Sequence, residues 1–135
     1  MKAAGVFEQL ANEGHSDSQF WIGMCLYWGR GVSEDEAKAF EWYNESANQG
    51  NSYGQWMVGW CYCGGRATSL DESKALEWYR KSAEQDNRYG QAELGDCYRF
   101  GVGLAEDTNS AIMWYRKSAD QGHEDATNRL KALNM

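Results

Sequence analysis

A tryptophan-tyrosine pair occurs three times in this chain at a fixed spacing. The pairs Trp42-Tyr43, Trp78-Tyr79 and Trp114-Tyr115 lie 36 residues apart. The surrounding segments also agree closely: FEWYNESANQGN, LEWYRKSAEQDN and IMWYRKSADQGH. A fixed period of this length indicates a solenoid, in which copies of one small helical unit stack and bury their apolar faces against one another.

Several other positions keep the same period without a gap. Four residue columns are shared by all three copies: Gly23, Gly59 and Gly95; Gln19, Gln55 and Gln91; Cys25, Cys61 and Cys97; and Ala47, Ala83 and Ala119. So many columns in register do not arise by chance. They predict that the 135 residues form one repeat domain.

Each copy has the pattern of two amphipathic helices joined by a glycine-containing loop. In the middle copy, Gly54, Val58 and Cys61 have helical spacing and predict a first helix over residues 52–64. The second helix is expected to end near Gln85. The chain contains no proline, which fits a mostly helical protein.

Local residue patterns predict where the helices begin and end. Ser69 with Glu72, and Ser33 with Glu36, predict a capping box at the start of the second helix. Ala105 stands at this place in the third copy, so a different cap is expected there. Left-handed residues are expected at the unit ends, at Gly50, Asp86 and Gly122.

The predicted fold is an all-α, right-handed superhelix of stacked antiparallel helix pairs. The flanking segments match partial copies, a lone second helix over residues 2–13 and a closing first helix over residues 124–133. The predicted units are an N-terminal half-repeat at 1–14, three full 36-residue repeats at 15–50, 51–86 and 87–122, and a C-terminal capping helix within 123–135.

Charge and hydropathy narrow the classes of partner. The formal net charge is −7, which disfavours nucleic acid and anionic membranes, because both carry negative phosphates. The first 20 residues contain no apolar run long enough for a signal peptide. No segment reaches the roughly 20 apolar residues of a membrane span. The expected compartment is the cytoplasm.

The cysteines and histidines do not form a pattern typical of catalysis or metal binding. The three cysteines of the repeated column should lie about a helix diameter apart, beyond disulfide reach, and are expected to be reduced. Cys61 and Cys63 have no second pair of ligands for zinc. His15 and His123 fall at the entries to first helices, where polar turn residues are common. We predict no catalytic residues, no metal and no cofactor.

First helices line the concave surface of such a superhelix, and their outward positions differ between copies. Aromatic residues and arginine at these positions are the usual anchors of protein interfaces. They predict a non-enzymatic module that binds an extended peptide or an amphipathic helix. The predicted partner-binding residues are Phe20, Met24, Tyr27, Tyr53, Trp56, Trp60, Tyr89 and Arg99.

Two further expectations concern the partner. Acidic residues at the starts of the second helices, such as Glu34-Asp35-Glu36, favour a partner that carries Lys or Arg. The apolar ends of the solenoid would also allow the chain to associate with a second copy of itself.

The third copy resembles a known family. It reads YGQAELGDCYRFGVG and continues with Asp107, Ala111 and Trp114, which is similar to the Sel-like (SEL-one-like) repeat family, relatives of the tetratricopeptide repeat. The first copy fits through its loop Gly29-Arg30-Gly31-Val32. The second copy departs at Gly64-Gly65-Arg66-Ala67, so its loop is expected to differ in shape.

The resemblance covers nearly the whole chain and implies an adaptor or scaffold for protein complexes. A specialised alternative is a small acidic inhibitor or immunity protein that blocks one basic partner. Disulfide-rich secreted members of the family have been linked to penicillin binding and lactam hydrolysis. Those members carry regular cysteine pairs, which this chain lacks, so a lactam or cell-wall hydrolase is the weaker alternative.

Overall fold

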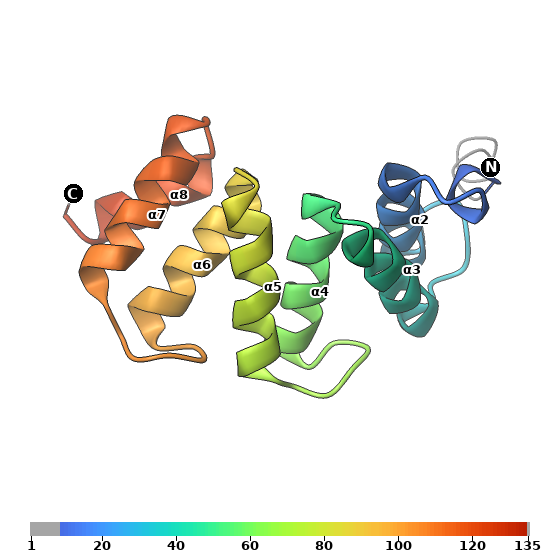
Figure 1. The fold of residues 1–135 in the computed structure, drawn as a ribbon, viewed down its shortest axis with the longest axis horizontal. Helices are drawn as coiled ribbons and strands as arrows, with labels where there is room; N and C mark the ends of the chain where they lie inside the picture. The colour runs from blue at the N-terminus through green and yellow to red at the C-terminus, as the bar shows by residue number, and fades with distance from the viewer. Residues whose placement is uncertain (1–8, 135) are drawn as a thin grey trace.

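The computed structural model describes residues 9–134, and the regular elements in this range are all α-helices (Figure 1). Residues 9–12 are helical as well, while the rest of the helix expected over residues 2–13 lies outside the described range. The helices are α2 (Ser16–Trp28), α3 (Glu36–Asn48), α4 (Ser52–Gly64), α5 (Glu72–Glu84), α6 (Arg88–Phe100), α7 (Thr108–Asp120) and α8 (Glu124–Ala132).

The helices form a row of antiparallel pairs from the N-terminal to the C-terminal end (Figure 1). Helices α2 and α3, α4 and α5, and α6 and α7 are the three pairs, and each pair packs against the next. The first helices also touch one another, α2 against α4 and α4 against α6. They therefore line the inner side of the stack, and the predicted all-α superhelix of helix pairs is confirmed.

A glycine-tyrosine contact joins the two helices of each pair. A Cβ atom added at Gly59 would lie 2.7 Å from the ring of Tyr79, closer than real Cβ contacts allow. The tyrosine is almost fully buried, with 1% of its surface exposed. The glycine column is therefore a packing requirement, and its contacts are Gly23 with Tyr43, Gly59 with Tyr79, and Gly95 with Tyr115.

Buried polar side chains bind each repeat to the next one. The Ser82 hydroxyl donates to the Ser52 carbonyl at 2.8 Å, and the Gln85 amide donates to the Gln55 side-chain oxygen at 2.7 Å. The same two bonds recur in the neighbouring repeats. The repeated serines thus satisfy backbone carbonyls of the preceding repeat, and the repeated glutamines bond to glutamines of that repeat.

The second helices begin with an aspartate cap. The Asp71 side chain accepts from the Lys74 backbone N–H at 3.1 Å, and Asp35 and Asp107 make the equivalent bond. The predicted capping boxes at Ser33 and Ser69 are therefore wrong, because each helix starts two residues later than they require. The third copy needs no special cap.

The loop of the middle repeat keeps the path of the other two loops, contrary to expectation. The Arg66 N–H donates to the Cys61 carbonyl at 2.8 Å, and the Asp71 N–H donates to the Tyr62 carbonyl at 3.0 Å, as at the equivalent positions of the third repeat. Ala67 takes a positive φ of 60°, where the other loops have Gly31 and Gly103 at 76° and 78°. A β-carbon is strained in this region.

The helix ends elsewhere follow the predicted pattern. Helix α4 has the predicted bounds of residues 52–64, α5 ends one residue before Gln85, and α8 ends one residue before 133. The left-handed residues at the unit ends are confirmed, with positive φ at Gly50, Asp86 and Gly122. Within residues 9–134, no helix combines the length and the apolar character that a membrane crossing requires.

Candidate functional site

A cleft of about 540 Å³ opens on the inner helices α2, α4 and α6. This volume lies within the range of small-ligand sites. Asp17 supplies a negative charge, and the remaining lining residues are aromatic rings and a methionine. The lining consists of Asp17, Phe20, Trp21, Met24, Tyr53, Trp56 and Tyr89.

Aromatic rings form a continuous row along this cleft. Phe20 contacts Tyr53 with a distance of 5.5 Å between ring centroids, and Tyr53 lies 6.2 Å from Tyr89. Trp56 stacks on Tyr89 at 4.6 Å with an interplanar angle of 19°. At the far end, the edge of His123 packs against Tyr89 at 5.0 Å. The row therefore runs across four first helices, from α2 to the start of α8.

The rings of the cleft differ in exposure, which separates the floor from the rim. Phe20 is buried at 5% exposure, whereas Trp21 and Tyr53 are 49% and 42% exposed. Trp56 is partly buried and packs against the core on both sides of the central repeat. Trp21 and Tyr53 are thus the most exposed rings of the cleft lining.

Five of the eight predicted binding residues line the cleft, namely Phe20, Met24, Tyr53, Trp56 and Tyr89. The other three lie elsewhere. Tyr27 is buried and packs against Trp60 at 5.0 Å. The guanidinium of Arg66 covers the Trp60 ring at 4.0 Å, and it also donates to the Trp60 carbonyl. Arg99 lies over its neighbour Phe100.

Asp17 and Trp21 belong to the cleft but were not predicted as binding residues. The equivalents of Trp21 in later repeats are Met57, which is buried at 3% exposure, and Glu93. This column therefore mixes packing and surface residues. A tryptophan at a position that holds methionine or glutamate in the later copies was the available signal.

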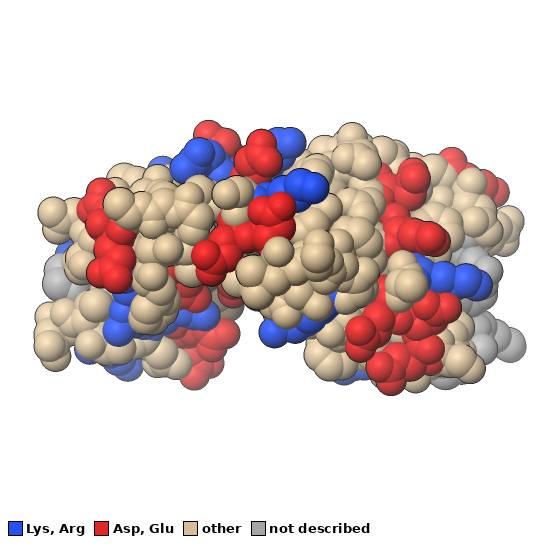
Figure 2. Space-filling model, turned by 90° about the horizontal axis from the view of Figure 1, so that it is seen from below, with Lys and Arg blue, Asp and Glu red and all other residues tan. Residues whose placement is uncertain are grey.

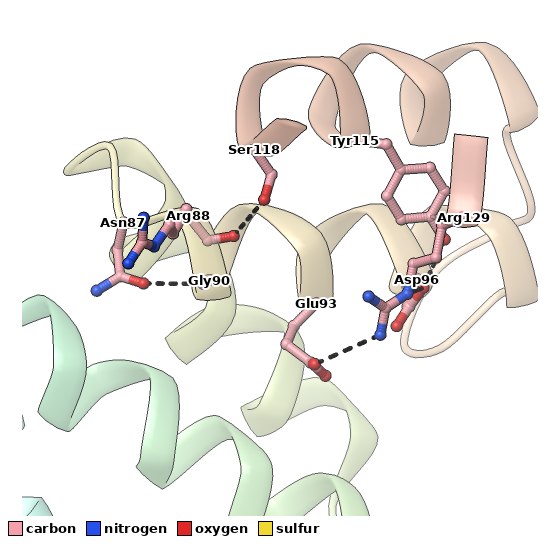
Figure 3. A network of polar contacts seen from close by, with 8 residues as sticks. All are labelled: Asn87, Arg88, Gly90, Glu93, Asp96, Tyr115, Ser118 and Arg129. Atoms are coloured by element: carbon pink, nitrogen blue, oxygen red, sulfur yellow. Dashed lines mark hydrogen bonds and ion pairs between the residues drawn. The ribbon is translucent and has the colours of Figure 1, made fainter. Parts of the chain in front are cut away.

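The C-terminal half of the inner surface carries a cluster of charged groups in addition to the Tyr89 and His123 rings. Arg129 of α8 pairs with Asp96 of α6 at 2.9 Å and lies 4.0 Å from Glu93 (Figure 3). The Tyr115 hydroxyl donates to Asp96. Burial, helped by the charge of Asp96 and opposed by Arg129, raises the pKa of Glu93 to about 7. The charges here are paired within the chain.

Carboxylates also gather on the edge where the loops within each pair lie. Figure 2 views this edge from below, and red acidic side chains form several patches across it. The aspartate caps and first-turn glutamates of the second helices belong to this acidic edge, at Asp35-Glu36 and Asp71-Glu72. The caps stabilise the helix starts and at the same time make this edge negative.

The four cysteines are free thiols. Burial raises the pKa of both Cys61 and Cys97 to about 12, so these thiols stay protonated and are poor nucleophiles at neutral pH. Within the described residues, no group of three or more His, Cys, Asp or Glu side chains is placed to hold a metal ion.

His15 and His123 occupy the N-cap positions of α2 and α8, as predicted, but neither makes a side-chain capping bond. Asn51 and Asn87, at the equivalent positions, do cap their helices. Burial lowers the pKa of His123 against the opposing charge of Asp125. Both histidines therefore mark the starts of helices, and the imidazole of His123 is the last ring of the aromatic row.

Solved structures of helical repeat proteins have the same architecture. A Sel1 repeat protein from Oxalobacter formigenes is 30% identical with a TM-score of 0.83, and the match covers 98% of this chain and 99% of that one. A protective antigen of uropathogenic Escherichia coli strains with an SLR fold is 33% identical with a TM-score of 0.85. That match covers 92% of this chain, which spans 27% of the antigen.

Helicobacter pylori cysteine rich protein B is 20% identical with a TM-score of 0.76 over 94% of each chain, a similarity that supports the fold alone. No curated protein matches the chain. The Sel1 repeat family model matches three consecutive segments, residues 16–51, 52–87 and 88–123. Each match begins one residue after the start of a predicted repeat. The chain belongs to the Sel1 repeat family.

Proposed function

We propose that this chain is a non-enzymatic interaction module that binds a segment of a partner protein in its aromatic cleft. The observation that carries the proposal is a division between two kinds of column. The glycine and tyrosine columns that pack each helix pair are the same in every copy, whereas two columns of the cleft change, from Asp17 to Tyr53 to Tyr89 and from Phe20 to Trp56 to Ala92. Packing does not require this variation, but recognition of an asymmetric partner does.

The chemistry of the cleft suits a protein partner. Tryptophan and tyrosine are enriched among residues that dominate interface energetics, because they bury a large area with few rotatable bonds. Trp21 and Tyr53 already present half-exposed rings above a buried floor. An extended peptide or one face of an amphipathic helix would bury these rings.

The family supports the same class of function, since Sel1 repeats commonly form protein-interaction scaffolds. The acidic charge of the chain favours a partner with basic residues over a nucleic acid or a membrane surface. The cytoplasm is the compartment we propose, because free thiols persist there.

Affinity capture with paired baits tests the proposal. A double variant, Trp21→Ser with Tyr53→Ser, removes the two exposed rings of the cleft. The matched control is Trp28→Ser. Trp28 lies on α2, as Trp21 does, and its ring is 52% exposed and outside the cleft. We expect a protein that is retained by the unchanged chain and by the control, and that is lost from the double variant.

The same set of proteins retained by all three baits would contradict the proposal. Circular dichroism of each bait checks that the helices and their melting temperature are preserved, so that loss of capture reports on the cleft rather than on folding.

A further inference from the structure

We propose that the end of the cleft between α2 and α4 binds the positively charged side chain of a lysine or arginine from the partner. This inference rests on the proposed function and specifies the chemistry that the cleft recognises. The groups that carry it are three rings, Trp21, Tyr53 and Trp56, and the carboxylate of Asp17 in the same lining.

Aromatic faces beside a carboxylate form a site for an organic cation. The negative face of each ring attracts a cation within about 6 Å, and tryptophan does so most strongly. The Asn51 amide donates to Asp17 at 2.6 Å and holds the carboxylate at the cleft. An apolar side chain placed here would desolvate Asp17 without compensation, whereas a cation would pair with it.

Three of the other tryptophans show that this chain places cations over indole rings. Trp60, Trp78 and Trp114 each carry one of the chain's own cations over the ring, at 4.0, 4.3 and 4.8 Å. Among residues 9–134, no Lys or Arg lies over Trp56 or Tyr53. These two cleft rings are therefore available for a cation from outside.

Arg88 determines which end of the cleft is available. Its guanidinium lies 5.3 Å from the Tyr89 ring and donates to the Gln121 carbonyl, at the C-terminal end of the aromatic row. A second cation would be repelled from that end. The incoming side chain is thus directed to Tyr53 and the Asp17 carboxylate, away from Arg88.

Titration of the full chain with matched amino-acid probes tests this assignment. The probes are N-acetyl-arginine methylamide with its neutral isostere N-acetyl-citrulline methylamide, and N-acetyl-lysine methylamide with its side-chain acetylated form. Binding is followed through the indole N–H signals of Trp21 and Trp56 in proton–nitrogen NMR spectra. We expect each cation to bind roughly fivefold or more tightly than its neutral counterpart.

A charge variant and its control sharpen the test. Asp17→Asn keeps an oxygen for the Asn51 amide and should weaken binding of the arginine probe roughly fivefold. Glu77→Gln removes an exposed carboxylate of α5 and should leave binding unchanged.

Equal affinity for charged and neutral probes would overturn the cation assignment and leave the proposed peptide-binding function standing. Unmoved Trp21 and Trp56 signals with all four probes would also overturn it. The capture experiment with paired baits decides the proposed function independently of either result.

Discussion

The two halves of the inner surface are built from the same columns but have opposite chemistry. One column holds Trp21 on α2, Met57 on α4, Glu93 on α6 and Arg129 on α8. In the N-terminal half it exposes a ring beside a cleft, and in the C-terminal half it forms an ion pair network within the chain. The scaffold therefore fixes where side chains point without fixing what they do, and we propose that the binding surface lies in the N-terminal half.

The tyrosine hydroxyls of the packing column show the same difference. The Tyr43 hydroxyl donates to the Met24 sulfur at 3.2 Å, and the Tyr115 hydroxyl donates to Asp96. In the middle repeat the equivalent neighbour is Trp60, and the buried Tyr79 hydroxyl has no partner with hydrogen-bond geometry among the described residues. The Tyr79 hydroxyl still acts on Cys63 and Glu93 and favours their charged forms. The aromatic inner surface thus leaves it weaker partners than the carboxylate that Tyr115 contacts.

The largest effect on stability is expected at the glycine-tyrosine contact, which both halves of the molecule share. Gly59→Ala forces a Cβ atom to 2.7 Å from the Tyr79 ring and should lower the free energy of unfolding by about 3 kcal/mol. Gly64→Ala in the same helix meets only the flexible end of Arg66 and should change stability by less than about 1 kcal/mol. Denaturant unfolding measures both, and equal losses would mean that the glycine column is not a packing requirement.

The ion network of the C-terminal half should make stability depend on pH. The folded-state pKa of Glu93 is about 7, above the ordinary 4.5 of the unfolded chain, so the folded chain retains a proton that the unfolded chain releases. Stability should therefore fall by roughly 2 kcal/mol as the pH rises from 4.5 to 7. Glu93→Gln should remove this part of the pH dependence.

Chemical denaturation at pH 5 and pH 8 measures this difference. Asp96, Arg129 and Arg66 also act on Glu93, so the comparison is made between the variant and the unchanged chain at each pH. A variant that loses stability with pH as steeply as the unchanged chain would show that Glu93 is not the titrating group.

Removing the tyrosine hydroxyls one at a time tests the contrast between repeats. Tyr115→Phe deletes a bond to a carboxylate and should cost about 1–2 kcal/mol. Tyr79→Phe deletes a hydroxyl that makes no bond of good geometry and only weak interactions with Cys63 and Glu93, so it should cost less than about 1 kcal/mol. Thermal unfolding compares the two variants, and a larger loss for Tyr79→Phe would reverse the contrast.

The smallest effect is expected in the loop of the middle repeat. Ala67 has a φ of 60°, where its equivalents are glycines. Ala67→Gly should relieve this strain and raise the free energy of unfolding by up to about 1 kcal/mol. Asp86→Gly, at another positive φ between repeats, provides a second measure of the same effect. Destabilisation by both changes would show that neither residue is strained.

The sequence predicted the repeat architecture well, because the packing columns recur in three copies and each copy independently supports the same assignment. Helix α4 has its predicted bounds, and the glycine column contacts the tyrosine column in every copy. The N-cap residues of the second helices were harder to predict, because Ser69 and Asp71 lie two positions apart and both are favourable cap residues. The backbone bond from Asp71 to Tyr62 fixes the loop path and selects the aspartate.

The sequence did not predict which of the proposed binding residues would lie together in one cleft. Side chains from outside the first helices make contacts that the repeat columns do not show. Arg66 reaches back from its loop and covers Trp60, which removes this ring from the free surface. Trp21 enters the cleft from a column that holds a buried methionine in the next repeat. Long side chains from loops and changes of residue type within a column decide such details, and neither follows the 36-residue period.

The tryptophans offer the most direct test of where a partner binds, because they are distributed over both kinds of helix. A peptide from the captured partner is titrated into the nitrogen-labelled chain, and the indole N–H signals are followed by NMR. Our account predicts shifts at Trp21 and Trp56 on the inner helices, with Trp78 and Trp114 on the second helices unmoved. Shifts confined to Trp78 and Trp114 would contradict it.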